Sequence, residues 1–351
     1  TQFMMPCMML IMNCVSVAIV WFGGIRVDEG ALQTGDLIAF ITYAMVIIMG
    51  FLMIGMISIM LPRANVAAER VDEVIECEPT VVDPARPRDA ELSASACGEG
   101  ATIEFEDVTF SYKDASAPAL EHITFRAEPG KTTAIIGATG SGKSTIAKLM
   151  MRFYDVTEGS VRIDGIDVRE LSQHALRAQM GYVPQKAFLF SGTVESNVAY
   201  SDGEMDASRV ERALDIAQAS DFVGEMEEGA SSPISQGGTN VSGGQRQRLA
   251  IARALAVPAR AYIFDDSFSA LDYKTDAALR AELSEKLSDA TVVIVAQRIS
   301  TIMRADEIVV LDEGRICGLG THEQLMDACE EYREIALSQL SEEELKGGDA
   351  Q

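Results

Sequence analysis

The residue pair Asp265 and Asp266 carries the plainest chemical signal in this sequence. The pair ends the apolar run "AYIF" at residues 261–264, so both carboxylates are expected at the tip of a buried strand. Two neighbouring acids in such a place repel each other and lose hydration. The arrangement therefore indicates that a cation, a proton or a reacting group lies nearby.

A glycine-rich stretch, "GATGSGKST" at residues 137–145, predicts where a charged ligand binds. It follows the apolar strand "TTAIIG" and opens the helix "STIAKLMMRF", which is the context that the motif GxxxxGK[ST] requires. Glycines let the backbone wrap around phosphate oxygens at a helix N-terminus. Lys143 is expected to reach the β- and γ-phosphates, and the Ser144 hydroxyl to ligate Mg²⁺. The candidate nucleotide-binding residues here are Gly137, Thr139, Gly140, Ser141, Gly142, Lys143, Ser144 and Thr145.

This motif predicts roles for the two aspartates. P-loop proteins use an Asp at a strand end to hold Mg²⁺, so Asp265 joins Ser144 as a predicted metal-site residue. The next residue normally polarises the attacking water, which makes Asp266 the candidate general base. ATP and Mg²⁺ are the cofactors that follow from this hypothesis.

The composition excludes some other functions. The 351 residues include 53 Asp and Glu against 29 Lys and Arg, and nucleic-acid-binding surfaces are basic, so no nucleic-acid partner is expected. The six Cys form no CxxC pair and only three His are present, so the spacing indicates neither a zinc motif nor a redox motif.

Two uncharged runs predict a membrane segment. Residues 1–25 and 37–62 contain no charge, and each run exceeds the roughly 20 residues that a helix needs to cross a bilayer. A hairpin of two transmembrane helices is predicted, and a pair of buried helices in a large soluble core is the alternative. Arg63 and Arg70 follow the second run, which favours the cytosol for the downstream side. The predicted location is the cell membrane, multi-pass and in contact with lipids, with the rest of the chain in the cytoplasm.

Changes in composition divide the chain into four parts. Residues 1–78 are predicted to be the membrane segment with a cytosolic helical extension, and residues 79–100, rich in Pro, Gly and small residues, to be a linker. Residues 101–340 alternate short apolar strands with helices, which predicts an α/β domain, and residues 341–351 form an acidic tail. The chain starts in mid-helix without an initiator Met, so it is expected to be the C-terminal part of something longer.

The sequence from 101 to about 340 resembles the ATP-binding cassettes of ABC transporters. "VSGGQRQRLAIARAL" at 241–255 resembles the signature usually written LSGGQ, and "SALD" at 269–272 resembles the D-loop. Tyr112 resembles the aromatic residue that stacks on adenine, and Gln185 the glutamine that joins the Mg²⁺ site to the membrane domain. The uncharged runs resemble the last two of six transmembrane helices in an ABC exporter half-transporter. The resemblance implies an α-helical membrane segment followed by an α/β P-loop NTPase domain with a helical subdomain.

In this family two cassettes bind two ATP molecules head to tail, and the P-loop of one cassette faces the signature of the other. The resemblance implies that the signature hydrogen-bonds the γ-phosphate held by a partner, where small residues let the backbone approach closely. The candidate residues for that contact are Ser242, Gly243, Gly244 and Gln245.

The sequence departs from the family at two catalytic positions. Asp266 stands where the family has Glu, and Gln297 stands where it has a switch His. The shorter Asp withdraws its carboxylate from the water, and a misplacement of roughly 1 Å can cost about a hundredfold in rate. Gln297 can donate a hydrogen bond to phosphate, but it does not titrate as imidazole does. Together with Lys143, these residues form a predicted catalytic set that binds Mg-ATP and hydrolyses it poorly.

A damaged hydrolytic site beside a nearly intact signature predicts a heterodimer, in which this chain lends its signature to a second half-transporter. The predicted function is ATP-driven export of a substrate that the sequence does not identify. Three alternatives remain. They are a homodimeric exporter, an ATP-gated regulatory subunit without transport turnover, and a soluble ABC ATPase, against which the uncharged runs argue.

Overall fold

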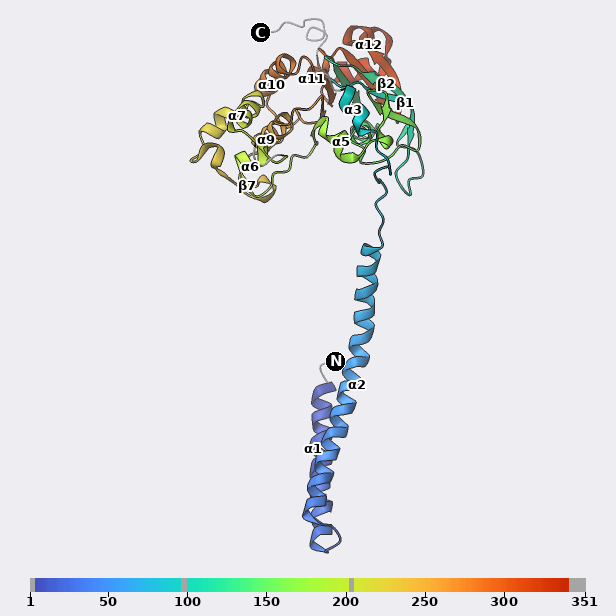
Figure 1. Cartoon of the computed structure of the whole chain (residues 1–351), viewed down its shortest axis with the longest axis vertical. Coiled ribbons are helices and arrows are strands. Elements are labelled where there is room, and N and C mark those ends of the chain that lie inside the picture. The colour runs from blue at the N-terminus through green and yellow to red at the C-terminus, as the bar shows by residue number, and fades with distance from the viewer. Residues whose placement is uncertain (1–3, 96–99, 202–204, 341–351) are drawn as a thin grey trace. The chain divides into compact units, whose positions relative to one another are not determined.

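The computed structural model describes residues 4–95, 100–201 and 205–340, and it divides into two compact units between Pro79 and Thr80. A helical hairpin forms the first unit and an α/β domain forms the second, which confirms the predicted fold class (Figure 1). The acidic tail predicted at 341–351 lies outside the described residues.

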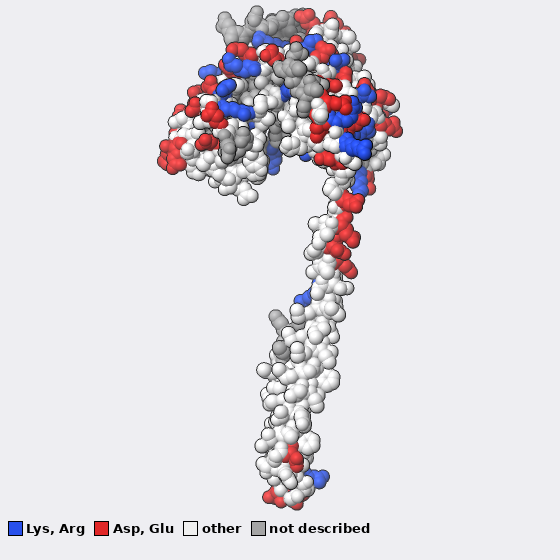
Figure 2. Space-filling view, in the orientation of Figure 1, with Lys and Arg blue, Asp and Glu red and all other residues white. Residues whose placement is uncertain are grey.

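The first unit is a hairpin of the helices α1 (Met4–Asp28) and α2 (Thr34–Ile75). Both helices are long and apolar enough to cross a membrane, and no part of their apolar spans is buried within the structure. Large side chains such as Trp21 and Phe51 are exposed, which suits helices surrounded by lipid and argues against the alternative of a soluble core. Figure 2 shows most of the hairpin as a surface without charged residues.

Helix α2 is longer than a membrane span. Its 42 residues extend roughly 63 Å at 1.5 Å per residue, which is about twice the hydrocarbon thickness of a bilayer. A capping box between Gln33 and Asp36 fixes its N-terminus. Arg63 and Arg70 lie in its C-terminal part, so this part is a charged rod that continues beyond the apolar run.

Over its described residues, the second unit is built on three sheets. An antiparallel sheet has the strand order β2-β1-β4-β5, a short sheet pairs β7 with β8, and a larger sheet has the order β12-β11-β3-β10-β9-β6. In the larger sheet every neighbouring pair is parallel except β11 and β12. The strands are β1 (Ile103–Phe110), β2 (Leu120–Ala127), β3 (Thr132–Gly137), β4 (Glu158–Ile163), β5 (Ile166–Asp167), β6 (Met180–Val183), β7 (Gly192–Thr193), β8 (Pro233–Ile234), β9 (Ala261–Asp265), β10 (Thr291–Val295), β11 (Glu307–Asp312) and β12 (Arg315–Gly320).

Helices surround these sheets, and α6, α7 and α9 gather in one lobe with β7 and β8, the place of the expected helical subdomain (Figure 1). The α-helices of this unit are α3 (Asp89–Ser95), α4 (Lys143–Met150), α5 (Gln173–Ala178), α6 (Val194–Val198), α7 (Ala207–Ile216), α8 (Ser220–Gly224), α9 (Gly243–Leu255), α10 (Tyr273–Lys286), α11 (Ile299–Ile302), α12 (His322–Ala328) and α13 (Glu330–Gln339). The 3₁₀ turns in the described part of this unit are η1 (Val168–Glu170), η2 (Gly229–Ser231) and η3 (Gln236–Gly238).

The larger sheet brings the carboxyl ends of β3, β9 and β10 together. Val295 at the end of β10 pairs with Asp265 at the end of β9 and, on its other side, with Ile135 of β3. Every residue of β9 and β10 is buried, as the continuous apolar runs of parallel strands require. The loops that follow these three strands therefore lie side by side at one edge of the sheet.

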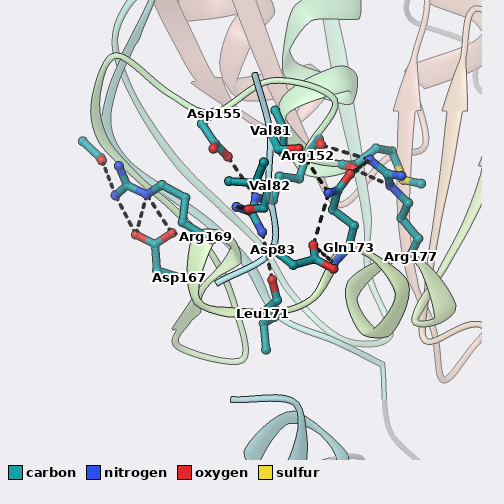
Figure 3. A network of polar contacts seen from close by, with 12 residues as sticks. Val81, Val82, Asp83, Arg152, Asp155, Asp167, Arg169, Leu171, Gln173 and Arg177 are labelled. Carbon is teal, nitrogen blue, oxygen red and sulfur yellow. Dashed lines mark hydrogen bonds and ion pairs between the residues drawn. The ribbon is translucent and has the colours of Figure 1, made fainter. Parts of the chain in front are cut away.

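Part of the segment predicted as a linker, residues 79–100, forms hydrogen bonds with the α/β domain (Figure 3). Asp83 accepts a hydrogen bond from the backbone N–H of Gln173 at 2.9 Å, at the N-terminus of α5. Arg152, which is 2% exposed, donates a hydrogen bond to the Val82 carbonyl oxygen at 3.0 Å. Leu92 is 1% exposed and belongs to the core. The Pro-rich composition signals an irregular backbone, but it does not reveal these side-chain anchors.

Candidate nucleotide-binding site

The loop between β3 and α4 has the backbone that its glycines predict. Gly140 and Gly142 have φ values of 88° and 99°, a region that favours glycine. A Cβ atom on Gly142 would lie 2.5 Å from Leu120 Cδ2, so the loop also passes too close to β2 for a side chain. Gly142 then caps the N-terminus of α4, where free N–H groups suit an anion. The loop is a backbone cradle that fits a phosphate group.

Lys143 begins α4, and its ammonium group lies against this loop. Its Nζ donates hydrogen bonds to the carbonyl oxygens of Gly137 at 2.8 Å and Ala138 at 2.6 Å. Burial lowers the pKa of Lys143, and the charges of Asp266 and Asp265 offset part of that effect. The positive charge is therefore held between the loop backbone and the two carboxylates.

Asp265, the last residue of β9, faces the first turn of α4. Its Oδ1 accepts a hydrogen bond from Ser144 Oγ at 2.8 Å, and its Oδ2 accepts one from the Tyr182 hydroxyl at 3.5 Å. Asp265 is 3% exposed, and this burial raises the pKa of its carboxyl although the Ser144 hydrogen bond lowers it. The predicted pair of Ser144 and Asp265 thus lies together, and hydroxyl and carboxylate oxygens are the ligands that Mg²⁺ prefers.

Asp266 turns its carboxylate toward two amide side chains. Its φ of 48° is uncommon for a residue other than glycine, and its N–H bonds the Val295 carbonyl oxygen at 2.9 Å. Its Oδ2 accepts hydrogen bonds from Gln185 Nε2 at 3.0 Å and from Gln297 Nε2 at 2.7 Å. Three candidates from separate parts of the sequence therefore form one cluster around a single carboxylate oxygen.

Two residues that contact members of this site escaped the sequence analysis. Tyr182 stands three positions before Gln185, and its hydroxyl reaches Asp265. Gln339, at the end of α13, accepts a hydrogen bond from the Ile299 N–H at 2.9 Å and donates one to the Gln297 carbonyl oxygen at 2.8 Å. Gln339 lies 42 positions from Gln297, so no local pattern indicates this contact.

Tyr112 lies beside the first turn of α4. Its hydroxyl is 3.1 Å from Thr145 Oγ1. Its ring meets those of Phe110 and Tyr154 edge-on, with centroid distances of 4.8 and 5.3 Å, and the Lys148 ammonium lies 6.0 Å from its centroid. An aromatic ring at this place is suited to stack on a planar base next to the cradle.

The signature residues lie on another helix, α9. Ser242 caps this helix, because its Oγ accepts from the Gln245 N–H at 3.2 Å and its own N–H bonds Gln245 Oε1 at 2.9 Å. A Cβ atom on Gly243 would meet no atom within 4 Å, whereas one on Gly244 would lie 3.4 Å from the Ala270 carbonyl oxygen. In the part of the chain that the structure describes, no hydrogen bond joins these side chains to the loop before α4. The signature residues are therefore not joined by hydrogen bonds to the phosphate-binding loop of the same chain.

The cradle, the Lys–Ser–Asp arrangement and the parallel sheet together define a P-loop nucleotide-binding domain. The family model described as ABC transporter matches residues 120–269 of the chain. An uncharacterized ABC transporter ATP-binding protein of Mycobacterium tuberculosis is 45% identical over 339 residues, which are 96% of this chain and 57% of the relative. An ATP-dependent lipid A-core flippase of Vibrio vulnificus is 41% identical over 241 residues, or 68% of this chain and 41% of the flippase.

A solved structure of a bacterial Atm1-family ABC exporter with ATP bound superimposes with a TM-score of 0.78 at 31% identity, covering 96% of this chain and 58% of the exporter. The chain therefore carries an ABC transporter ATP-binding domain joined to a membrane segment, in the manner of Atm1-family exporters. It is a membrane protein whose ATP-binding domain is cytoplasmic. The chain spans little more than half the length of the mycobacterial relative and of the exporter.

Proposed function

We propose that this chain contributes to ATP-driven export across the membrane, as part of one half of a heterodimeric ABC transporter. Its ATP-binding domain binds Mg-ATP at a site that turns over slowly, and its signature completes the site of a partner half-transporter. The observation that carries the proposal is that the Asp266 carboxylate is held by the amides of Gln185 and Gln297. At the positions of Asp266 and Gln297 the family has a longer acid, Glu, and an imidazole, His, which promote hydrolysis.

The chain's own residues divide the binding of Mg-ATP among them. The cradle and Lys143 hold the phosphates, and Tyr112 stacks on the adenine. Ser144 and Asp265 hold Mg²⁺, with Gln185 adjoining them through Asp266. When bound, Mg²⁺ neutralises phosphate charge in the manner of a Lewis acid. The 2.8 Å contact between Ser144 and Asp265 supports this division, because both oxygens already face the same point of the sheet edge.

Slow hydrolysis follows from the side chains at the two altered positions. Asp266 is one methylene shorter than Glu, and its Oδ2 is already engaged by two amides. Gln297 donates a hydrogen bond but has no titrating nitrogen to exchange a proton. A general base contributes on the order of 10²–10⁴ in rate when it is correctly placed, so its displacement is enough to leave a site that binds ATP and seldom cleaves it.

The partner is proposed to be a different half-transporter, because the signature retains what the head-to-tail arrangement requires. Ser242 caps α9 in an exposed turn, and Gly243 leaves open space in front of the helix N-terminus. Free N–H groups at such a terminus favour the charge of a γ-phosphate. The two departures from the family, Asp266 and Gln297, thus lie at the site for this chain's own nucleotide.

The proposal is tested by the variant Asp266→Asn in the two-subunit complex, reconstituted in lipid vesicles. ATPase turnover should stay within about twofold of the wild type, because the partner's site performs most of the hydrolysis. Asn keeps the size of Asp, so ATP binding by this chain serves as the control for its fold. A loss on the order of 100-fold would show that Asp266 is the working base, as in an active homodimer, and would contradict the proposal.

A further inference from the structure

The cysteines Cys317 and Cys329 come together with Glu331 at β12, the edge strand of the larger sheet. Their ligand atoms, two Sγ and one carboxylate oxygen, all lie within 4.8 Å of one another. The Cys329 Sγ lies 3.4 Å from Glu331 Oε2 and 3.9 Å from the Cys317 carbonyl oxygen, and either oxygen can accept its hydrogen. Cys317 belongs to β12, Cys329 lies between α12 and α13, and Glu331 is the second residue of α13, so the cluster joins β12 to the connection between these two helices.

A local irregularity of β12 aims Cys317 into this cluster. Val310 pairs with Gly318 and Leu311 with Ile316, so Cys317 is the extra residue of a β-bulge. A bulge re-aims the side chain of its extra residue. A Cβ atom on Gly318 would lie 2.9 Å from Cys329 Sγ, so glycine at 318 is what lets the Cys329 thiol approach the strand.

The charged side chains that act most strongly on Cys317 are acidic. Partial burial of its thiol, together with the neighbouring Cys329, Glu331 and Asp312, raises the pKa of Cys317 to about 12. Among the residues described, neither Glu331 nor Asp312 takes part in an ion pair. Two thiols and a carboxylate without a cation form a set that a divalent metal would stabilise.

We propose that Cys317, Cys329 and Glu331 form a binding site for Zn²⁺. Thiolate and carboxylate are ligands that Zn²⁺ takes in tetrahedral sites, with a Zn–S distance of about 2.3 Å that places two ligands roughly 3.8 Å apart. The observed upper limit of 4.8 Å needs only small side-chain rotations to reach that separation. Water supplies the fourth ligand on the exposed side of Cys317. Both thiols release their protons when the metal binds.

Bound Zn²⁺ would link β12 to the start of α13. The other end of this helix carries Gln339, whose side chain bonds the Gln297 carbonyl oxygen and the Ile299 N–H. The metal would therefore steady a helix that supports the Gln297 loop of the ATP site. The expected signature of this link is slower amide exchange across α13 when zinc is present, because local opening of the helix becomes rarer.

The test measures metal binding by the purified transporter under reducing conditions. One Zn²⁺ per chain should remain after gel filtration, and Co²⁺ added in its place should give a thiolate-to-cobalt charge-transfer absorption. Cys317→Ser should weaken that absorption, because only the Cys329 thiolate would remain, and Glu331→Gln should weaken Zn²⁺ binding at least about 10-fold. Cys77→Ser is the matched control, because Cys77 is exposed and lies outside the cluster.

Cys317 is exposed, so its replacement leaves the core intact and circular dichroism should confirm that the variant is folded. The proposal is overturned if the reduced wild type retains no zinc, or if Cys317→Ser binds zinc as tightly as the wild type. A Cys317–Cys329 disulfide found by peptide mapping of protein kept in reductant would overturn it as well, because both sulfur ligands would then be consumed.

Discussion

Replacing Gly243 by Val tests the head-to-tail arrangement with little cost to the chain itself. Gly243 is the first residue of α9, directly after the capping Ser242. A Cβ atom there would meet nothing within 4 Å, and Gly243 is not among the glycines with positive φ. The isopropyl group would therefore project from the N-terminus of α9 toward whatever lies opposite the signature.

The two effects of this substitution differ greatly in size. Within the chain, an exposed substitution that creates no contact changes the free energy of unfolding by no more than about 0.5 kcal/mol. At the interface, the side chain would keep the backbone N–H groups of the signature away from the partner's γ-phosphate. Loss of one such donor from a transition state costs on the order of 10²–10³ in turnover. The expected result is a folded complex with almost no ATPase activity.

The assay compares ATPase turnover and thermal unfolding of the reconstituted complex for the wild type, Gly243→Val and Gly224→Val. Gly224 is the matched control, because it ends the short helix α8, is exposed, and also leaves open space around a Cβ atom. Both variants should unfold at the wild-type temperature, and only Gly243→Val should lose activity. Wild-type turnover in Gly243→Val would refute the assignment of this turn to the partner's nucleotide.

Three further variants test the chain's own site. Lys143→Ala should weaken ATP binding about 10- to 100-fold, because a charge-assisted hydrogen bond contributes about 1.5–3 kcal/mol, and unchanged affinity in an equilibrium binding assay would count against the P-loop assignment. The double variant Asp266→Glu with Gln297→His should raise the ATPase rate of this chain's site on the order of 10- to 100-fold, because the carboxylate extends further and an imidazole replaces the amide. An unaltered rate would argue that the site is not impaired at these positions. Gln339→Ala should lower the midpoint of thermal unfolding by about 2–4 °C, because roughly 1 kcal/mol of hydrogen bonding to Gln297 and Ile299 is lost. If scanning calorimetry finds no shift, the contact does not contribute to stability.

The phosphate cradle could be predicted from the sequence because its determinants are local, whereas Ser144 and Asp265 lie 121 positions apart and meet only through the order of the strands. The backbone freedom of Gly140 and Gly142 is a property of those residues, and the order strand, loop and helix brings Lys143 to the loop without help from distant segments. The uncharged length of α1 and α2 is likewise a property that composition reveals directly. A predicted linker, by contrast, proved to be partly anchored, because hydrogen bonds such as that between Asp83 and Gln173 join positions 90 residues apart.

The sequence by itself determined that a P-loop domain follows an apolar hairpin, and it marked Asp266 and Gln297 as unusual. Only the tertiary structure decided that Gln185 and Gln297 share one oxygen of Asp266, since this depends on the order and register of three strands. The same holds for Cys317 and Cys329. Their spacing matches no metal motif, yet a single β-bulge brings the two thiols together. Backbone conformation is set largely by nearby residues, whereas the partners of a side chain are set by how distant strands and helices pack.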